Sequence, residues 1–304
     1  MTDKLLLICG PTASGKTALA IECAKRLNSE VVSADSLYVY KGLNIGTAKP
    51  FENEKEGVVH HLIDVATPIK NFTVSDYKSL AEPIIYALQK NGVIPVVCGG
   101  TGFYINSLLY DLSYGNGQAN LEVREKYKNL AIKYGNHYVY EILKEKDLET
   151  ANKLHFNDLK RVIRALEICE SGQKKSEIVD DFTPKHKYYA YAVNYPRDVL
   201  YERIDKRVDK MFEMGLIDEV KGLLSNGISF DSQSMQGIGY KELRGYFSGE
   251  QTLSQVKDLI KLNTRHYAKR QITYFKKLDG LKWLEIDSVE KLATTIIKEI
   301  SEND

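Results

Sequence analysis

Residues 5–17 read Leu5-Leu6-Leu7-Ile8-Cys9-Gly10-Pro11-Thr12-Ala13-Ser14-Gly15-Lys16-Thr17. The apolar run at their start is typical of a strand buried on both faces of a parallel sheet. The residues from Gly10 to Thr17 match the phosphate-binding pattern G-x-x-x-x-G-K-[ST] at every fixed position. With the helix expected over 17–27, this stretch predicts a P-loop. Its backbone amides face phosphate oxygens, Lys16 adds a positive charge, and the Thr17 hydroxyl is a ligand for Mg²⁺.

Two more strand-like segments, 30–35 and 93–98, end in residues suited to a site. The first ends at Asp35, and Gly99-Gly100-Thr101-Gly102 follows the second. Because parallel strands end at one edge of a sheet, we expect these residues to lie beside the P-loop. Further strands are expected over 188–194 and 281–286, and helices over 198–224, broken at Gly215, and over 253–278. The sequence thus predicts an α/β fold of the P-loop NTPase type, an open parallel sheet with helices on both faces.

The middle of the chain changes character at the turn-rich break Tyr114-Gly115-Asn116-Gly117-Gln118. From there to about residue 182 the sequence is helical and charged. We therefore expect a mostly helical insertion domain over 113–186, set into a P-loop α/β catalytic core over 1–112 and 187–304.

Composition narrows the class of protein. With 304 residues, 43% hydrophobic and 27% charged, the chain is expected to fold rather than stay disordered. A net charge of +1 means that a polyanionic partner must be met by local basic patches. The four cysteines show no C-x-x-C pairing, which disfavours a zinc site or a disulfide framework. Neither a signal segment nor a run of 18 apolar residues is present, so we expect a soluble cytoplasmic protein without membrane contact.

Segments along most of the chain resemble, in order, the motifs of tRNA dimethylallyltransferases. They include Ser33-Ala34-Asp35-Ser36-Leu37-Tyr38-Val39-Tyr40, Asn44-Ile45-Gly46-Thr47-Ala48-Lys49-Pro50, His60-His61-Leu62-Ile63-Asp64, Gly99-Gly100-Thr101-Gly102-Phe103-Tyr104, Arg161-Val162-Ile163-Arg164-Ala165-Leu166-Glu167 and Gly239-Tyr240-Lys241-Glu242-Leu243. The chain departs from the family pattern at Tyr38, where glutamine is common, and at Phe103, where leucine is. The strand before Gly99 also lacks a Walker-B carboxylate, which disfavours the motor ATPases.

The resemblance implies an activity and a donor site. The dimethylallyl group of dimethylallyl diphosphate passes to the exocyclic N6 amine of the adenine 3′-adjacent to the anticodon. In this family the P-loop residues 10–17 hold the diphosphate with Mg²⁺, and Arg207 helps to neutralise it. Asp35 accepts the proton of the amine, which is a weak nucleophile. Thr101 lies near the flipped adenine.

The resemblance also implies the surface that binds the anticodon stem-loop. The expected tRNA-binding residues are Asp35, Ser36, Leu37, Tyr38, Thr101, Arg124, Lys160, Arg161, Val162, Ile163 and Arg164. A second basic stretch, 264–277, carries Arg265, Lys269, Arg270, Lys276 and Lys277. We expect the protein to act as a monomer.

Three other functions fit part of the pattern. An adenylate isopentenyltransferase runs the same chemistry on a free nucleotide, a P-loop small-molecule kinase transfers phosphate from ATP, and a regulatory module binds nucleotide without catalysis. The long insertion and the basic helices are more than a free nucleotide needs, so the sequence favours tRNA.

Overall fold

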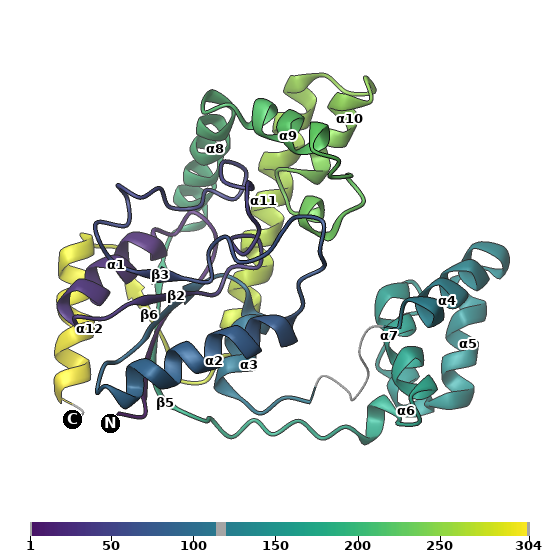
Figure 1. Ribbon diagram of the computed structural model, residues 1–304, viewed down its shortest axis with the longest axis horizontal. Coiled ribbons are helices and arrows are strands. Elements are labelled where there is room, and N and C mark those ends of the chain that lie inside the picture. Colours follow the sequence, from purple (N-terminus) through teal and green to yellow (C-terminus); the bar gives the residue numbers. More distant parts are fainter. Residues whose placement is uncertain (1, 114–119, 303–304) are drawn as a thin grey trace. The chain divides into compact units, whose positions relative to one another are not determined.

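The computed structural model describes residues 2–113 and 120–302, so the break at 114–118 lies outside the described residues (Figure 1). The chain forms two compact units. The core unit is Met1–Leu109 with Pro184–Asp304, and the insertion unit is Tyr110–Thr183. None of the helices built from the described residues has the length and apolar character needed to cross a membrane.

The described part of the core unit contains one parallel sheet of six strands in the order β3-β2-β4-β1-β5-β6 (Figure 1). The strands are β1 (Lys4–Cys9), β2 (Val31–Ser33), β3 (His60–His61), β4 (Val96–Gly99), β5 (Lys187–Asn194) and β6 (Leu281–Glu285). The predicted open parallel sheet is therefore confirmed. The strand β3 was not predicted, because two residues are too few to show a strand pattern.

Helices cover both faces of this sheet. Alternate residues of β1 point to opposite faces. Leu6 and Ile8 pack in one buried cluster with side chains of α1 and α12, whereas Leu5 and Leu7 are buried toward the other face. The helices near the sheet are α1 (Lys16–Arg26), α2 (Val74–Lys90), α3 (Gly102–Leu109) and α12 (Val289–Glu302). The sequence analysis missed α2, which begins with a capping box between Thr73 and Asp76 and contains a proline.

A second group of helices in the core unit follows β5. They are α8 (Arg197–Glu213), α9 (Leu216–Ser225), α10 (Arg244–Phe247) and α11 (Leu253–Phe275), with short 3₁₀ turns η2 (Gln233–Gln236) and η3 (Lys241–Leu243). Gly215 ends α8 with a φ of 95°, as the predicted break requires.

Ion pairs join α8 to α11. Asp205 binds Arg265, and Asp209 binds both Lys257 and Lys261. Arg265, expected among the RNA-contacting residues, is thus engaged within the protein.

The insertion unit is helical. It contains α4 (Leu121–Tyr134), α5 (Asn136–Lys146), α6 (Leu148–Asn152), η1 (Lys175–Glu177) and α7 (Leu159–Glu170). Its own core is built from Tyr127, Val139, Leu143, Val162 and Leu166, all 1% exposed or less. A separate core of this kind is what defines an independent domain.

Candidate active site

The P-loop lies between β1 and α1 and takes a conformation that needs its glycines. Gly10 and Gly15 have φ values of 127° and 77°, in the region that favours glycine. Ala13 also has a positive φ, 62°, which an ordinary side chain tolerates less well. The Lys16 ammonium folds back over the loop and donates to the Pro11 carbonyl at 3.1 Å. The loop is therefore held in shape by both backbone and side chain.

A cavity of about 1030 Å³ opens beside the P-loop at the carboxyl ends of the strands. Its lining is rich in cations: Lys16, Arg203, Lys206, Arg207, Lys210, Lys241 and Arg270. Like Lys16, two of the arginines are fixed by carbonyl groups, since Arg203 Nε donates to Ala13 O at 2.8 Å and Arg207 Nη2 donates to Thr47 O at 2.8 Å. A cavity of this charge is suited to an anionic ligand.

The positive charge of Lys16 is affected by its surroundings in this cavity. Burial is the largest cause that lowers the pKa of Lys16 below its ordinary value of 10.5, and the charge of Arg207 lowers it further. Cys98, Asp35 and Cys9 act in the opposite direction. Two cations this close repel each other, so a bound anion would stabilise both.

This arrangement predicts proton uptake on anion binding. Only the protonated lysine attracts diphosphate, so affinity falls as pH rises through the lowered pKa of the free protein. The bound anion raises that pKa again, so binding should take up protons at pH values between the lowered pKa of the free protein and the higher pKa of the complex. Calorimetry of inorganic diphosphate binding, in buffers of different ionisation enthalpy, measures this uptake. Lys16→Arg is the matched control, because arginine stays protonated and should remove the part of the uptake that Lys16 contributes. Equal uptake in both proteins would contradict the assignment to Lys16.

Asp35 and Thr101 are brought together where β2 and β4 end. Ala34 N donates to Cys98 O at 2.7 Å, and Thr101 N donates to Ala34 O at 3.1 Å. Only glycine fits at position 99, since a Cβ there would lie 2.2 Å from Ala34 O. This close approach brings the turns after the two strands together, with Asp35 at the cavity.

The two side chains then take different contacts. Asp35 lines the cavity, and its Oδ1 accepts the Leu37 N–H at 2.9 Å. Thr101 Oγ1 accepts the Ser36 N–H at 3.0 Å. Tyr267 hydrogen-bonds to the Thr101 side chain, and burial and the charge of Asp35 raise the pKa of Tyr267. Tyr267 therefore keeps its proton at neutral pH beside both residues.

Gln271 is a site residue to which the sequence analysis gave no role. It is 5% exposed and joins the P-loop to the glycine turn after β4. Its Oε1 accepts the Thr12 N–H at 2.8 Å, and its Nε2 donates to Gly100 O at 2.9 Å. The Thr12 amide is thus engaged by Gln271, which leaves the amides of residues 13–17 to face a phosphate.

Ser36, Leu37 and Tyr38 line the same cavity. The Tyr38 hydroxyl donates to Ala48 O at 2.8 Å, and Tyr38 also hydrogen-bonds to Arg207. The tyrosine that departs from the family pattern therefore contacts the candidate diphosphate arginine.

In the insertion unit, two of the expected tRNA-binding arginines contact a buried carboxylate. Glu167 is 3% exposed. Arg164 Nη1 lies 2.7 Å from Glu167 Oε2, and Arg124 Nη2 lies 3.1 Å from the same oxygen. Both cations lower the pKa of Glu167 against the opposing effect of burial. Removing either arginine would leave a buried charge short of a partner, so these residues have a structural role whatever else they contact.

The other expected residues of α7 lie on two different sides of the helix. Lys160 and Arg161 are exposed, and Arg161 Nε lies 3.3 Å from Asp158 Oδ2. Val162 and Ile163 are 0% and 6% exposed and belong to the core of the insertion unit. Their side chains therefore pack inside the insertion unit.

The histidines and Asp64 of the third motif have structural contacts. His60 and His61 lie on β3, where His61 contacts Glu30 and His60 Nδ1 lies 2.8 Å from Val58 O. Asp64 Oδ1 accepts from Lys49 Nζ at 2.7 Å. Among the described residues, no three His, Cys, Asp or Glu side chains are grouped as metal ligands. Thr17, the expected metal ligand, lines the cavity beside Lys16.

Comparison with known proteins identifies the family. The model of the IPP transferase family matches residues 38–278. A tRNA dimethylallyltransferase of Acetivibrio thermocellus is 45% identical over 95% of both chains. Another, from Clostridioides difficile, is 44% identical over 95% of this chain and 93% of its own.

Solved structures agree with this. The full-length tRNA isopentenylpyrophosphate transferase of Bacillus halodurans is 39% identical, with a TM-score of 0.74 over 99% of this chain and 98% of its own. A eukaryotic dimethylallyltransferase described as acting on tRNA is 28% identical, with a TM-score of 0.80 over 98% of this chain and 77% of its own. The chain therefore belongs to the IPP transferase family, a family of transferases.

Proposed function

We propose that this protein transfers the dimethylallyl group of dimethylallyl diphosphate to the N6 amine of the adenine 3′-adjacent to the anticodon in tRNA, releasing diphosphate. The observation that carries the proposal is the position of Asp35. Its carboxylate lines the same cationic cavity as the P-loop, so one cavity holds both the groups that would bind an anionic donor and the carboxylate that would accept a proton from an amine acceptor.

The P-loop side of the cavity supports departure of the diphosphate. Negative charge develops on the bridging oxygen as the bond to the allylic carbon breaks. Lys16, Arg207 and the amides of residues 13–17 face that charge and are already fixed in place. Donors fixed before the reaction stabilise a developing charge without reorganisation.

Asp35 and its neighbours support attack by the amine. The Leu37 N–H fixes Asp35 Oδ1, and Asp35 accepts a proton from N6 as the new bond to carbon forms. Thr101 is held by Ser36 and Tyr267 next to this carboxylate and orients the adenine.

The donor site suits Mg²⁺. Thr17 presents a hydroxyl at the cavity, and the described residues offer no cluster of carboxylates or imidazoles around it. A magnesium ion here would take its other ligands from the diphosphate and water, as Mg²⁺ does in phosphate sites, and would neutralise the leaving group.

The insertion unit supports tRNA as the acceptor. Its exposed cations Lys160 and Arg161 lie at the start of α7, where their side chains can reach RNA phosphates. Contact with RNA through this turn involves these two side chains and the backbone, not the buried Val162 and Ile163.

Changing Lys160 and Arg161 together to alanine should weaken tRNA binding and raise the KM for tRNA. The salt dependence of binding should become shallower by about 0.7 for each phosphate that the variant no longer neutralises. The KM for dimethylallyl diphosphate should not change, because the core unit holds the donor. Arg164 is left in place because it contacts the buried Glu167.

A matched control is Lys128→Ala with Lys153→Ala, which removes two exposed cations from the same unit. Filter binding over a range of salt concentrations measures both proteins. If the test variant keeps the wild-type salt slope, this turn does not contact RNA, and the basic residues of α11 become the leading candidates.

An acceptor competition tests the proposed function against the adenylate alternative. The protein is incubated with labelled dimethylallyl diphosphate, Mg²⁺ and either bulk tRNA or AMP. We expect label in tRNA and not in AMP, and the reverse would identify an adenylate isopentenyltransferase. The cytoplasmic location and the monomeric state stay predictions.

A further inference from the structure

One wall of the cavity is a segment without helix or strand. Gly46, Thr47, Ala48 and Pro50 line the cavity, and Ala48 has a φ of 51°. The segment belongs to a stretch that resembles the family, 44–50, but none of its residues has a role in the proposed chemistry. Two backbone hydrogen bonds close a turn within it, from Ala48 N to Ile45 O at 2.9 Å and from Lys49 N to Asn44 O at 3.1 Å, and contacts from elsewhere hold the rest.

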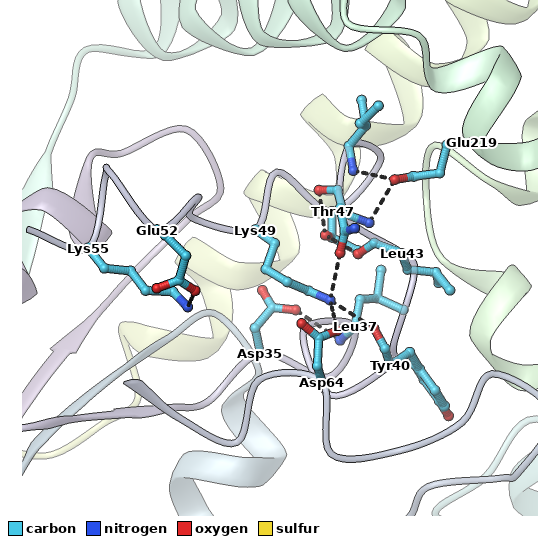
Figure 2. Close-up of polar contacts among 12 residues, drawn as sticks. Asp35, Leu37, Tyr40, Leu43, Thr47, Lys49, Glu52, Lys55, Asp64 and Glu219 are labelled. Carbon is cyan, nitrogen blue, oxygen red and sulfur yellow. Dashed lines mark hydrogen bonds and ion pairs between the residues drawn. The ribbon is translucent and has the colours of Figure 1, made fainter. Parts of the chain in front are cut away.

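Glu219 supplies the contacts from outside the segment (Figure 2). Its Oε2 accepts the N–H groups of Asn44 at 2.9 Å and Ile45 at 2.7 Å, and its Oε1 accepts that of Gly46 at 3.1 Å. The Tyr240 hydroxyl donates to the same Oε1 at 2.7 Å. One carboxylate thus binds three successive backbone amides and a buried phenol.

Close packing leaves this contact little freedom. Tyr240 is 0% exposed, and a Cβ at position 46 would lie 2.5 Å from its ring. Gly239 also lies close to this segment, because a Cβ added to it would be 3.3 Å from the Gly46 carbonyl oxygen. The two glycines allow the ring and the segment to meet.

Lys49 holds the segment from inside (Figure 2). It is 5% exposed, and its ammonium donates to Tyr40 O at 2.8 Å and to Asp64 Oδ1 at 2.7 Å. Burial lowers the pKa of Lys49, while the bond to Asp64 favours its charged form. The segment is therefore fixed at both of its sides.

The contacts of Glu219 and Lys49 fix the position of the Thr47 carbonyl group. The Thr47 hydroxyl donates to Leu43 O at 2.7 Å, and the Thr47 carbonyl accepts from Arg207 Nη2 at 2.8 Å. That hydrogen bond and the contact with Tyr38 hold the guanidinium at the cavity wall near Lys16.

We propose that Glu219 is a positioning residue for Arg207: by fixing the segment 44–47, it sets the Thr47 carbonyl that orients the guanidinium toward the diphosphate. This inference rests on the proposed function, and it assigns specificity for the diphosphate partly to a residue of α9. Glu219 does not line the cavity, so its effect on the substrate passes through the segment 44–47 and the Arg207 side chain that this segment holds.

Glu219→Gln tests this role. Glutamine has the same shape as glutamate, but its NH₂ group cannot accept the backbone N–H groups that both oxygens of Glu219 accept. We expect the KM for dimethylallyl diphosphate to rise about 10-fold, the scale for removing a hydrogen bond to a charged group, with the KM for tRNA unchanged. Asp218→Asn, on the same turn of α9 and exposed, is the matched control and should behave as wild type. Tyr240→Phe removes one donor only and should shift the same KM by a smaller factor, which keeps the test usable if Glu219→Gln folds poorly.

A double-mutant cycle with Arg207→Ala separates this role from a general structural one. If Glu219 acts through Arg207, Glu219→Gln should change the donor KM little once Arg207 is absent. An equal factor in both backgrounds would overturn the proposal and leave Glu219 as a fold-stabilising residue. Should Arg207→Ala itself leave the donor KM unchanged, the assignment of Arg207 to the diphosphate fails as well, whereas the acceptor competition would still report on tRNA prenylation.

Discussion

Asp35→Asn should lower kcat by about 10²–10⁴-fold, the usual contribution of a positioned general base, while tRNA affinity stays near that of the wild type. In the structure, this substitution changes the carboxylate without disturbing its backbone contact. Asparagine retains an Oδ1 that can accept the Leu37 N–H, so the turn after β2 is kept and only the proton acceptor is removed. Single-turnover prenylation of tRNA measures the effect on the chemical step.

Glu56→Gln provides the comparison for this variant. Glu56 is another carboxylate of the cavity lining, but it is exposed and contacts Lys25. Its replacement should leave kcat close to that of the wild type, as for most exposed positions. An Asp35→Asn protein that keeps more than half of the wild-type activity across neutral pH would mean that another group or water takes the proton.

Lys16→Ala should raise the KM for dimethylallyl diphosphate and lower kcat together, with kcat/KM down by about 10²–10³-fold. The ammonium group attracts the diphosphate in the ground state and stabilises it further as it leaves, so both constants depend on it. The relief of repulsion with Arg207 offsets only part of this. Steady-state kinetics at saturating tRNA gives both constants.

Lys25→Ala is the control on the same helix. Lys25 is exposed at the other end of α1 and contacts Glu56. It should show wild-type kinetics. Unchanged donor kinetics in Lys16→Ala would contradict the assignment of the P-loop to the diphosphate.

The parts of the site that are contiguous in sequence were predictable from it. The P-loop needs only one strand, one turn and one helix, all within residues 4–26. The meeting of Asp35 and Thr101 follows from a topological rule, since both residues come after strands of one parallel sheet. Their roles in the reaction stay predictions.

Contacts between distant segments could not be predicted. Gln271 reaches the Thr12 amide across 259 positions, and Glu219 reaches the Gly46 amide across 173. Neither pairing leaves a periodic pattern in the sequence. The motifs containing Gly46 and Tyr240 were visible, but their close packing against each other depends on the tertiary fold.

The contacts of the insertion-unit arginines were predictable only in part. A basic helix face resembles an RNA-binding surface whether its charges are free or engaged by acidic groups. Arg164 and Glu167 are three residues apart on α7, so that contact was readable. The contact of Arg124 with the same Glu167 comes from another helix and was not.

Product analysis of treated tRNA tests prenyl transfer to adenine most directly. The protein is incubated with dimethylallyl diphosphate, Mg²⁺ and unmodified tRNA. The tRNA is then digested to oligonucleotides and to nucleosides and analysed by mass spectrometry, and the released diphosphate is assayed. We expect N6-dimethylallyladenosine, in the oligonucleotide that follows the anticodon, in amounts equal to the diphosphate released. Unmodified tRNA at the end of the incubation would contradict this function.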